Sequence, residues 1–197
     1  MGNIDNQINQ AVITLGGTGS RLNEITMGVP KPLFKIDGLH TLERSIKVLY
    51  EQGITKFIWI TNYQHEFFLK EAKQLLSCYQ IKIFIHKEKE KKGEAGSLFD
   101  LIDKLDEEFI FLNGDIIFDI DIKRLHKFHN LNKSQITFVT HLTNHPEDSD
   151  CIIESPNLSI NKYKFKNEKN NVKGFYLGNS GLSVLSKKAI KIIDKSF

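Results

Sequence analysis

AVITLGGTGSRLNEITMGVPKPL, residues 11–33, decides the fold of this chain. It begins with an apolar, β-rich run over residues 11–15 and then breaks into the glycine-rich loop 16–21. A buried strand that ends in glycines leaves its next backbone N–H groups open, and because no Cβ stands in the way, a phosphate can approach them closely. A proline on each side of Lys31 restricts the backbone there. The stretch therefore predicts a strand that leads into an anion-binding loop, with Arg21 and Lys31 as two cations on one phosphate site.

Two commoner glycine loops do not fit this stretch. A P-loop requires a lysine directly after its last glycine, and no lysine follows Gly19 in that register. The dinucleotide fingerprint can be started at Gly17, but its third glycine falls on Leu22. The glycines alone are also compatible with a mobile turn. Arg21 and the Pro-Lys-Pro segment favour the binding loop, because a plain turn requires neither.

The rest of the chain alternates between strand-like and helix-like segments. Apolar residues at helical spacing predict helices over residues 41–52, 64–76, 93–105 and 122–131. Short β-rich runs predict strands over residues 56–61, 81–85, 109–112, 135–141 and 182–185. This alternation predicts an α/β fold, a mostly parallel central sheet with helices on both faces. Ligands of such sheets bind at the carboxyl ends of the strands, where the glycine-rich loop begins.

Composition limits the class of protein. The 197 residues are enough for one domain, and the net charge of +3 is too small to indicate a nucleic-acid-binding surface. The two cysteines, Cys78 and Cys151, have no metal or redox spacing, which favours a reducing, cytoplasmic location. No apolar run reaches the length of a transmembrane helix, and the polar first ten residues do not resemble a signal peptide. The charge run at residues 86–92 is typical of a solvated loop.

An acidic residue follows another apolar strand. Residues 109–112 run directly into Asn113-Gly114-Asp115. A carboxylate at the end of a buried strand is costly unless a cation or hydrogen-bond donors meet it, and Mg²⁺ is an economical partner. An Asx turn that closes the strand is the alternative. Two further acids, Asp119 and Asp121, are predicted to cap the helix that begins at residue 122.

Residues 15–22 and 30–33 together resemble the signature of the sugar-1-phosphate nucleotidyltransferases. The resemblance extends over about residues 11–193 and implies a Rossmann-like fold with a small β-hairpin part that binds the sugar. It implies catalytic roles for Arg21, Lys31 and Asp115, and it makes Asp115 the ligand of a Mg²⁺ cofactor. Residues that would bind the nucleotide are Leu15, Gly16, Gly17, Thr18, Gly19, Ser20, Glu94, Ala95 and Gly96. The family often has threonine at position 94; a carboxylate there is expected to accept the N–H groups of guanine, and the alternative is that Glu94 only favours the first turn of a helix.

The same resemblance implies a set of residues that bind the sugar phosphate. These are Gly114, Glu154, Glu168, Lys169 and Asn179. One extra residue separates Phe165 from Glu168 in comparison with the family pattern, so an exposed lysine is the alternative at Lys169. Asn179 is expected to contact a sugar hydroxyl, and an ordinary turn before the strand 182–185 is the alternative.

The substrate expectation depends on residues 145–150, HPEDSD. They resemble a segment of nucleotidyltransferase domains that are fused to heptose bisphosphate phosphatases. This implies GTP and D-glycero-D-manno-heptose 1-phosphate as substrates, a role in lipopolysaccharide or capsule biosynthesis, and a fused or partner phosphatase. A hexose 1-phosphate, mannose or glucose, is the alternative substrate, and a non-catalytic sugar-nucleotide sensor is the alternative function. Relatives continue to a further acidic metal ligand, so residues 1–197 are expected to form a single domain that lacks a C-terminal portion.

Overall fold

The computed structural model describes residues 7–17, 27–62, 64–90, 92–93, 95–145, 149–165 and 175–192. The chain forms two compact units: one combines Met1–Thr137 with Val184–Phe197, and the other is Phe138–Ser183. Over the described ranges, no helix combines the length and the apolar character that crossing a lipid bilayer requires.

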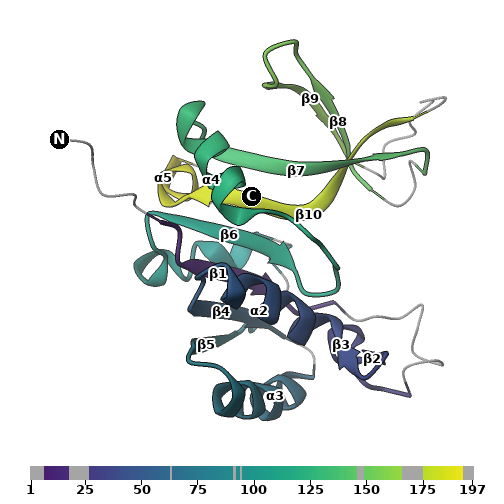
Figure 1. Ribbon diagram of the computed structural model, residues 1–197, viewed down its shortest axis with the longest axis vertical. Coiled ribbons are helices and arrows are strands. Elements are labelled where there is room, and N and C mark those ends of the chain that lie inside the picture. Colours follow the sequence, from purple (N-terminus) through teal and green to yellow (C-terminus); the bar gives the residue numbers. More distant parts are fainter. Residues whose placement is uncertain are drawn as a thin grey trace. The chain divides into compact units, whose positions relative to one another are not determined.

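The first unit contains most of the helices and strands, and Figure 1 labels its α-helices and β-strands. Its elements are β1 (Gln10–Thr14), η2 (Lys31–Leu33), β2 (Lys35–Ile36), β3 (Leu39–His40), α2 (Thr41–Glu51), β4 (Lys56–Thr61), α3 (His65–Cys78), β5 (Lys82–Lys87), η3 (Gly96–Leu98), η4 (Ile102–Lys104), β6 (Glu108–Asn113), α4 (Ile122–Leu131) and α5 (Lys187–Ile192). The predicted helices 41–52, 64–76 and 122–131 and the predicted strands 56–61, 81–85 and 109–112 are confirmed to within about two residues.

A parallel sheet forms the centre of this unit. Its strands lie in the order β5-β4-β1-β6, and β10 follows beside β6. In the register, Thr14 at the end of β1 pairs with Ile60 of β4 and with Asn113 of β6. Because β5, β4, β1 and β6 are parallel, the segments that follow these four strands emerge at the same edge of the sheet. The predicted α/β class and parallel pairing are confirmed.

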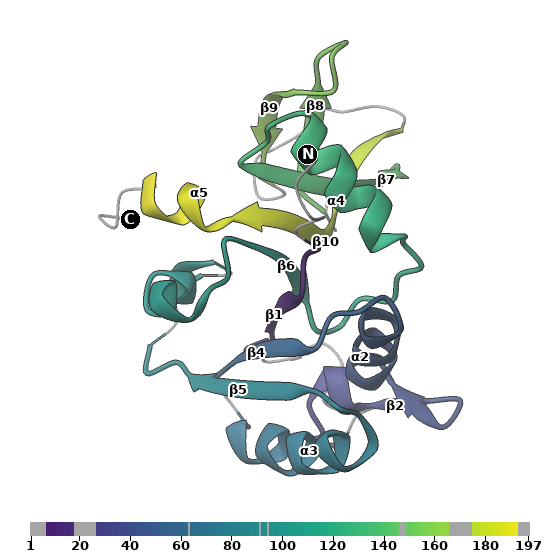
Figure 2. The same cartoon turned by 60° about the vertical axis from the view of Figure 1, so that its left-hand side comes forward.

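Helices α2 and α3 lie together over one face of the sheet (Figure 2). The rings of Tyr50 and Tyr79 meet edge to face with centroids 5.3 Å apart, and His40 Nε2 lies 3.0 Å from Glu71 Oε1. These two contacts join α3 to α2 near both ends of α2. Their apolar residues are buried because the alternate residues of β1 and β4 that point to this face are apolar too.

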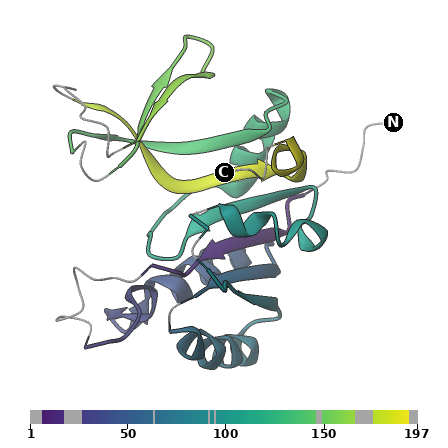
Figure 3. The same ribbon diagram turned by 180° about the vertical axis from the view of Figure 1, so that it is seen from behind.

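The opposite face is covered by η3, η4 and α5 (Figure 3). Here the buried cluster comprises Val12, Ile58, Ile60, Leu98, Leu101, Leu105, Phe109, Leu185 and Ile190. The predicted helix over residues 93–105 is wrong: the segment is two 3₁₀ turns, with i→i+3 hydrogen bonds such as Phe99 N to Gly96 O at 3.3 Å. The glycines at 93 and 96 lower the helix propensity, and burial of the three leucines is achieved without a regular helix.

The second unit contains antiparallel strands. Its elements are β8 (Cys151–Glu154), β9 (Ile160–Lys164), most of β7 (Ile136–Thr143) and the first part of β10 (Tyr176–Ser186). β8 pairs with both β9 and β10, and β7 pairs with β10. The expected hairpin is confirmed in β8 and β9. The alternative of an ordinary turn at residues 177–181 is wrong, because β10 continues through it, with the positive φ of 79° that Gly181 can adopt.

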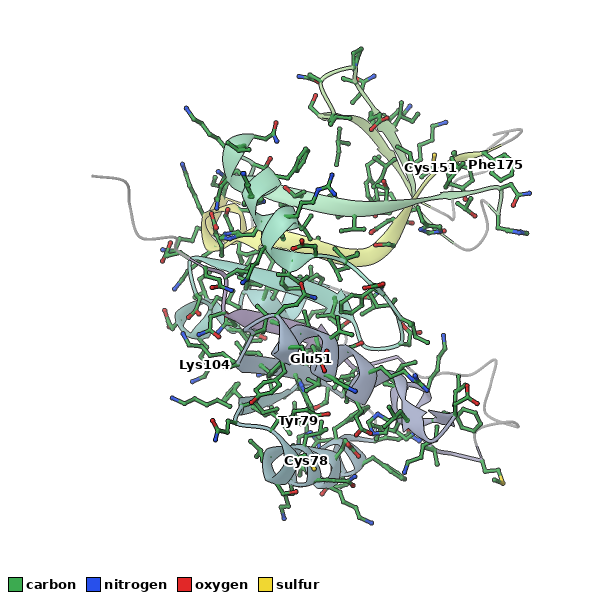
Figure 4. The ribbon with its side chains drawn as sticks, in the orientation of Figure 1. Glu51, Cys78, Tyr79, Lys104, Cys151 and Phe175 are labelled. Atoms are coloured by element: carbon green, nitrogen blue, oxygen red, sulfur yellow. The ribbon has the colours of Figure 1, made fainter. Side chains whose placement is uncertain are left out.

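Two smaller expectations are also tested. Asp121 caps α4, since its Oδ1 accepts a hydrogen bond from Arg124 N at 2.9 Å, whereas Asp119 is exposed and does not cap the helix. Cys78 ends α3 in the first unit and Cys151 begins β8 in the second (Figure 4), and both are free thiols. Burial raises the pKa of the Cys151 thiol, which makes it less reactive.

Candidate active site

The candidate site of the first unit lies at the edge where the parallel strands end. β1 ends in Thr14, whose Oγ1 donates a hydrogen bond of 3.1 Å to Asn113 Oδ1 at the end of β6. Leu15 N donates to Ile60 O of β4 at 2.7 Å, so β1 stays in the sheet up to the first glycine. Gly16 and Gly17 follow at the rim and are partly or fully exposed. The described part of the loop therefore starts where the sequence predicted, at the carboxyl end of the central strand.

The structure brings Lys31 and Asp115 together at this edge. Lys31 Nζ lies 2.6 Å from Asp115 Oδ2, and the two side chains are 45% and 36% exposed. Lys31 begins η2, a turn that Leu33 N closes with a hydrogen bond of 2.8 Å to Pro30 O. The Pro-Lys-Pro segment thus forms a closed 3₁₀ turn, and its stiffness stays a prediction. The two residues that were predicted to bind a phosphate and a metal ion are therefore in direct contact, and these roles stay predictions.

Gly114 is required by close packing between β1 and β6. Gly114 N donates to Thr14 O at 3.0 Å. A Cβ on Gly114 would lie 2.2 Å from Leu15 Cδ2 and 3.1 Å from Thr14 O, far inside van der Waals contact. The Leu15 side chain is 2% exposed and is directed at Gly114. The Leu15 side chain is therefore part of the core, and what it offers to a ligand is its backbone.

The carboxylate of Glu88 also lies at this edge, and the sequence did not predict it as a site residue. Glu88 directly follows β5, its N–H donates to Thr61 O at 2.7 Å, and its Oε2 accepts from Asn62 Nδ2 at 3.4 Å. Its Oε1 accepts a short hydrogen bond from Ser97 Oγ. The interpretation of residues 86–92 as a solvated loop is wrong for its first half, since His86 belongs to β5 and Glu88 is half-buried. Glu88 could have been identified as the first residue after a parallel strand, the position at which such sheets bind ligands.

Glu88 lies between the two segments that were predicted to bind the nucleotide. Asn62 also lies against Gly16, because a Cβ on Gly16 would come within 2.9 Å of Asn62 Nδ2. On the other side, Ser97 follows Ala95 and Gly96, and a Cβ on Gly96 would lie 2.5 Å from Lys92 Cβ. The glycine loop, Asn62, Glu88 and the Gly96 turn are thereby joined in one continuous row. The row brings together residues that the sequence predicted to bind the nucleotide, and that role stays a prediction.

In the second unit, the structure describes two of the predicted sugar-binding residues. Asn179 Nδ2 donates to Tyr163 OH at 3.3 Å, its Oδ1 accepts from Gly181 N at 3.0 Å, and Tyr163 OH donates to Asp150 Oδ2 at 2.6 Å. Glu154 ends β8 with its side chain exposed. A fixed amide in this unit agrees with a role in hydroxyl recognition, and both residues stay predictions as sugar ligands.

Several predicted residues lie outside the described part of the chain. These are Thr18, Gly19, Ser20 and Arg21 of the glycine loop, together with Glu94, Glu168 and Lys169. Of residues 145–150, the three central ones, 146–148, also lie outside it. Their roles stay predictions.

The donor chemistry at Asp115 fits a hard divalent cation. Mg²⁺ is usually held by one or two carboxylates, with water and substrate phosphate oxygens completing its coordination. Asp115 supplies such a carboxylate at the rim of the sheet, partly exposed. Among the residues that the structure describes, no group of three or more His, Cys, Asp or Glu side chains is gathered for a metal.

Comparisons with known proteins agree with this geometry. The family model described as "Nucleotidyl transferase" matches residues 10–189. A curated "Mannose-1-phosphate guanyltransferase" of Aspergillus fumigatus is 27% identical over 188 residues, which cover 94% of this chain and 51% of that protein. A "Probable mannose-1-phosphate guanylyltransferase 1" of Oryza sativa subsp. japonica is 32% identical over 148 residues, 73% of this chain and 41% of that protein. The chain thus spans about half the length of the curated relatives that it matches.

Solved structures share the fold at lower identity. The crystal structure of HddC from Yersinia pseudotuberculosis has a TM-score of 0.80 at 22% identity and covers 96% of this chain and 82% of that one. The same protein has been solved complexed with GMP-PN, at a TM-score of 0.79. The inositol-1-phosphate CTP transferase from T. maritima has a TM-score of 0.77 at 19% identity, covering 98% of this chain and 76% of that one. With a family model that spans most of the chain and motifs that meet at one sheet edge, the chain belongs to the sugar-1-phosphate nucleotidyltransferase family.

Proposed function

We propose that this chain is the nucleotidyl-transferring part of an enzyme that joins a nucleoside triphosphate to a sugar 1-phosphate and releases pyrophosphate. The observation that carries this proposal is the contact of 2.6 Å between Lys31 Nζ and Asp115 Oδ2 at the carboxyl edge of the sheet. Family membership supports the reaction class, and the match to only about half of the curated relatives' length makes the whole activity a matter for experiment.

The proposed reaction is an in-line displacement at the α-phosphorus of the triphosphate. An oxygen of the sugar phosphate attacks, the bond from the α-phosphorus to the bridging oxygen breaks, and pyrophosphate leaves. A phosphate monoester has its second pKa near ~6, so the nucleophile is already ionised at neutral pH and no general base is required. What the protein must supply is positioning of two anions and neutralisation of their charge.

The residues of the first unit fit these tasks. Lys31 binds the α-phosphate, while Arg21 of the glycine loop spans the triphosphate. Asp115 holds Mg²⁺, which supplies positive charge to the phosphoryl oxygens when it is bound. The backbone N–H groups after Leu15 add further donors without adding bulk. The second unit binds the sugar phosphate through Lys169, with Glu168, Glu154 and Asn179 at the sugar hydroxyls.

Guanine is the proposed base. Its N1–H and exocyclic NH₂ groups point the same way, and one carboxylate accepts both. Glu88 is a half-buried carboxylate beside the glycine loop and the Gly96 turn, with Asn62 and Ser97 holding it in place. The curated relatives are named guanyltransferases for mannose 1-phosphate, which supports the same base.

The proposed sugar has the manno configuration. D-glycero-D-manno-heptose 1-phosphate is the first candidate, from the resemblance of residues 145–150, and would connect the chain to lipopolysaccharide or capsule biosynthesis, with a fused or partner phosphatase. Mannose 1-phosphate is the second candidate, and the names of the curated relatives favour it. A cytoplasmic location suits a reaction between two diffusible phosphates.

The test is a grid of pyrophosphate release with four nucleoside triphosphates against heptose, mannose and glucose 1-phosphates, with Mg²⁺ present. GTP with one of the two manno sugars is expected to give the highest turnover, and the matched control, Asp115→Asn, to give at least about 100-fold less. Calorimetry with GTP runs in parallel. Nucleotide binding without pyrophosphate release for every pair would reject the enzyme and support the sensor.

A further inference from the structure

The first turn of α2 touches both segments that carry the charged pair. Thr41 Oγ1 lies 3.1 Å from Pro32 O and 3.3 Å from Gly114 O, so one hydroxyl proton is shared between two carbonyl oxygens. Pro32 directly follows Lys31, and Gly114 directly precedes Asp115. A single side chain therefore joins the backbone beside the lysine to the backbone beside the aspartate.

Thr41 belongs to a polar row on α2. One turn later, Ser45 Oγ donates to Ile116 O at 3.3 Å, and near the helix end Gln52 Nε2 donates to Ile120 O at 3.0 Å. These contacts satisfy carbonyl groups in the irregular segment that follows β6, where no sheet partner is present. Thr41 differs from the other two because it also reaches η2.

The N-terminus of α2 is held independently of the ligand site. His40 Nδ1 accepts a hydrogen bond of 3.0 Å from Glu43 N, so the imidazole caps the helix. Its other nitrogen, Nε2, then carries the proton and faces Glu71 Oε1 of α3 at 3.0 Å. Because His40 is 3% exposed, this link anchors the residue next to Thr41 in the core.

We propose that Thr41 is a positioning residue that fixes the spacing between Lys31 and Asp115 during the reaction. The inference rests on the proposed function. When Lys31 binds a phosphate and Asp115 a cation, their direct contact is exchanged for contacts to the ligands, and the shared hydroxyl of Thr41 still joins the two backbones. A reaction that depends on in-line geometry is sensitive to this spacing, since a misplacement of about 1 Å can lower the rate about 100-fold.

The test compares Thr41→Val, which keeps the shape and removes the hydroxyl, with Thr41→Ser, which keeps the hydroxyl. Thr41→Val is expected to lower kcat by about 10- to 100-fold with the KM for both substrates within about threefold of the original. Thr41→Ser should restore kcat to within about threefold. Ser45→Ala, the matched control, removes the neighbouring hydrogen bond that does not reach η2 and should leave kcat within about threefold.

A double variant separates positioning from general support of the fold. If Thr41 acts through the charged pair, Thr41→Val adds less than about twofold to the loss caused by Lys31→Met. A full additional loss, or an equal kcat for Thr41→Val and the original protein, would overturn the inference. Thermal unfolding of each variant shows that it is folded, and Thr41→Ala replaces Thr41→Val if the latter does not fold.

A crystal structure of each Thr41 variant gives a readout that does not depend on activity. The Cα separation of Lys31 and Asp115 is expected to change by more than about 0.5 Å in Thr41→Val and to be unchanged in Thr41→Ser. An unchanged separation in both rejects the positioning role even if the original protein shows no turnover. Lack of turnover with an altered separation rejects only the proposed function.

Discussion

Lys31 Nζ lies 2.6 Å from Asp115 Oδ2, although 84 residues separate the two along the chain. Each residue reaches this point from a different parallel-sheet connection, Lys31 from η2 after β1 and Asp115 from the end of β6. Exposed ion pairs contribute only about 0–1 kcal/mol to stability, so the fold gains little from this contact. The small contribution to stability is consistent with the ligand-binding roles proposed for both residues.

Lys31→Met should therefore separate activity from stability. We expect turnover to fall about 100-fold, because one cation at the reacting phosphate is lost. The free energy of unfolding should change by less than about 1 kcal/mol, because the side chain is 45% exposed. Pyrophosphate release and urea denaturation measure the two quantities.

Lys35→Met is the matched control for this experiment. Lys35 lies four residues away in β2 and is also exposed, but it has no contact with Asp115. Its replacement should leave turnover within about twofold. Equal turnover for Lys31→Met and Lys35→Met would show that Lys31 has no part in the chemistry.

Glu88→Gln should change the choice of nucleotide. The glutamine amide offers one acceptor and one donor where guanine presents two N–H groups. The NH₂ group of the glutamine would therefore face an N–H group of guanine, and neither could accept a hydrogen bond. We expect kcat/KM for GTP to fall about 10- to 100-fold and that for ATP to change much less, because mismatched hydrogen bonds are costly in a half-buried site. Glu90→Gln, an exposed residue of the same charge run, is the control. The same loss for all nucleotides would assign Glu88 to folding instead of base selection.

Local sequence predicted the strands and the sheet edge well, because glycine loops and apolar runs are local signals. Residues 11–33 indicated the loop, and Asn113-Gly114-Asp115 indicated the second strand end. The 3₁₀ turns of residues 95–105 were not predictable from periodicity, since the three buried leucines also fit a helix. Glu88 lies in a charge run, and its hydrogen bonds join it to Asn62 and Ser97, 26 and 9 residues away along the chain. Contacts of this kind exist only after the sheet has formed.

Gly114→Ala should destabilise the protein through one clash. The new Cβ would lie 2.2 Å from Leu15 Cδ2, so one of the two must move. Overpacking of this kind typically costs about 1–3 kcal/mol. In a protein that already carries Leu15→Ala, the change Gly114→Ala should cost less stability than it does in the original protein. The Leu15 Cδ2 methyl group that the new Cβ would clash with is then absent.

Gly17→Ala is the stability control for this pair, because a Cβ there meets nothing within 4 Å. It should leave the free energy of unfolding within about 0.5 kcal/mol of the original. Denaturant midpoints of the four proteins measure the effect. If Gly114→Ala and Gly17→Ala unfold alike, the β1 and β6 ends are not packed as the structure has them.

Acid should weaken the fold through His129. This residue of α4 is 1% exposed; its Nδ1 lies 2.8 Å from Thr137 Oγ1, and its Nε2 lies 3.2 Å from Ser186 Oγ. Burial lowers the pKa of His129 below the ordinary 6.5; the Glu108 carboxylate opposes this shift, and nearby His126 adds to it. The unfolded chain therefore takes up the proton first as the pH falls. The stability contributed by neutral His129 is present above about pH 6.5 and is lost progressively below it.

His129→Gln tests this expectation, because glutamine keeps hydrogen-bonding capacity and does not titrate. The original protein should lose more stability than the variant between pH 7.5 and pH 5.5, as measured by urea denaturation at both values. His141→Gln, at an exposed position of β7, should lose as much as the original protein. The difference between the two variants isolates the buried imidazole from the other groups that titrate in this range. If His129→Gln loses the same stability as the original, the imidazole takes up its proton equally in the folded and unfolded chains, and its burial does not control the acid limit of the fold.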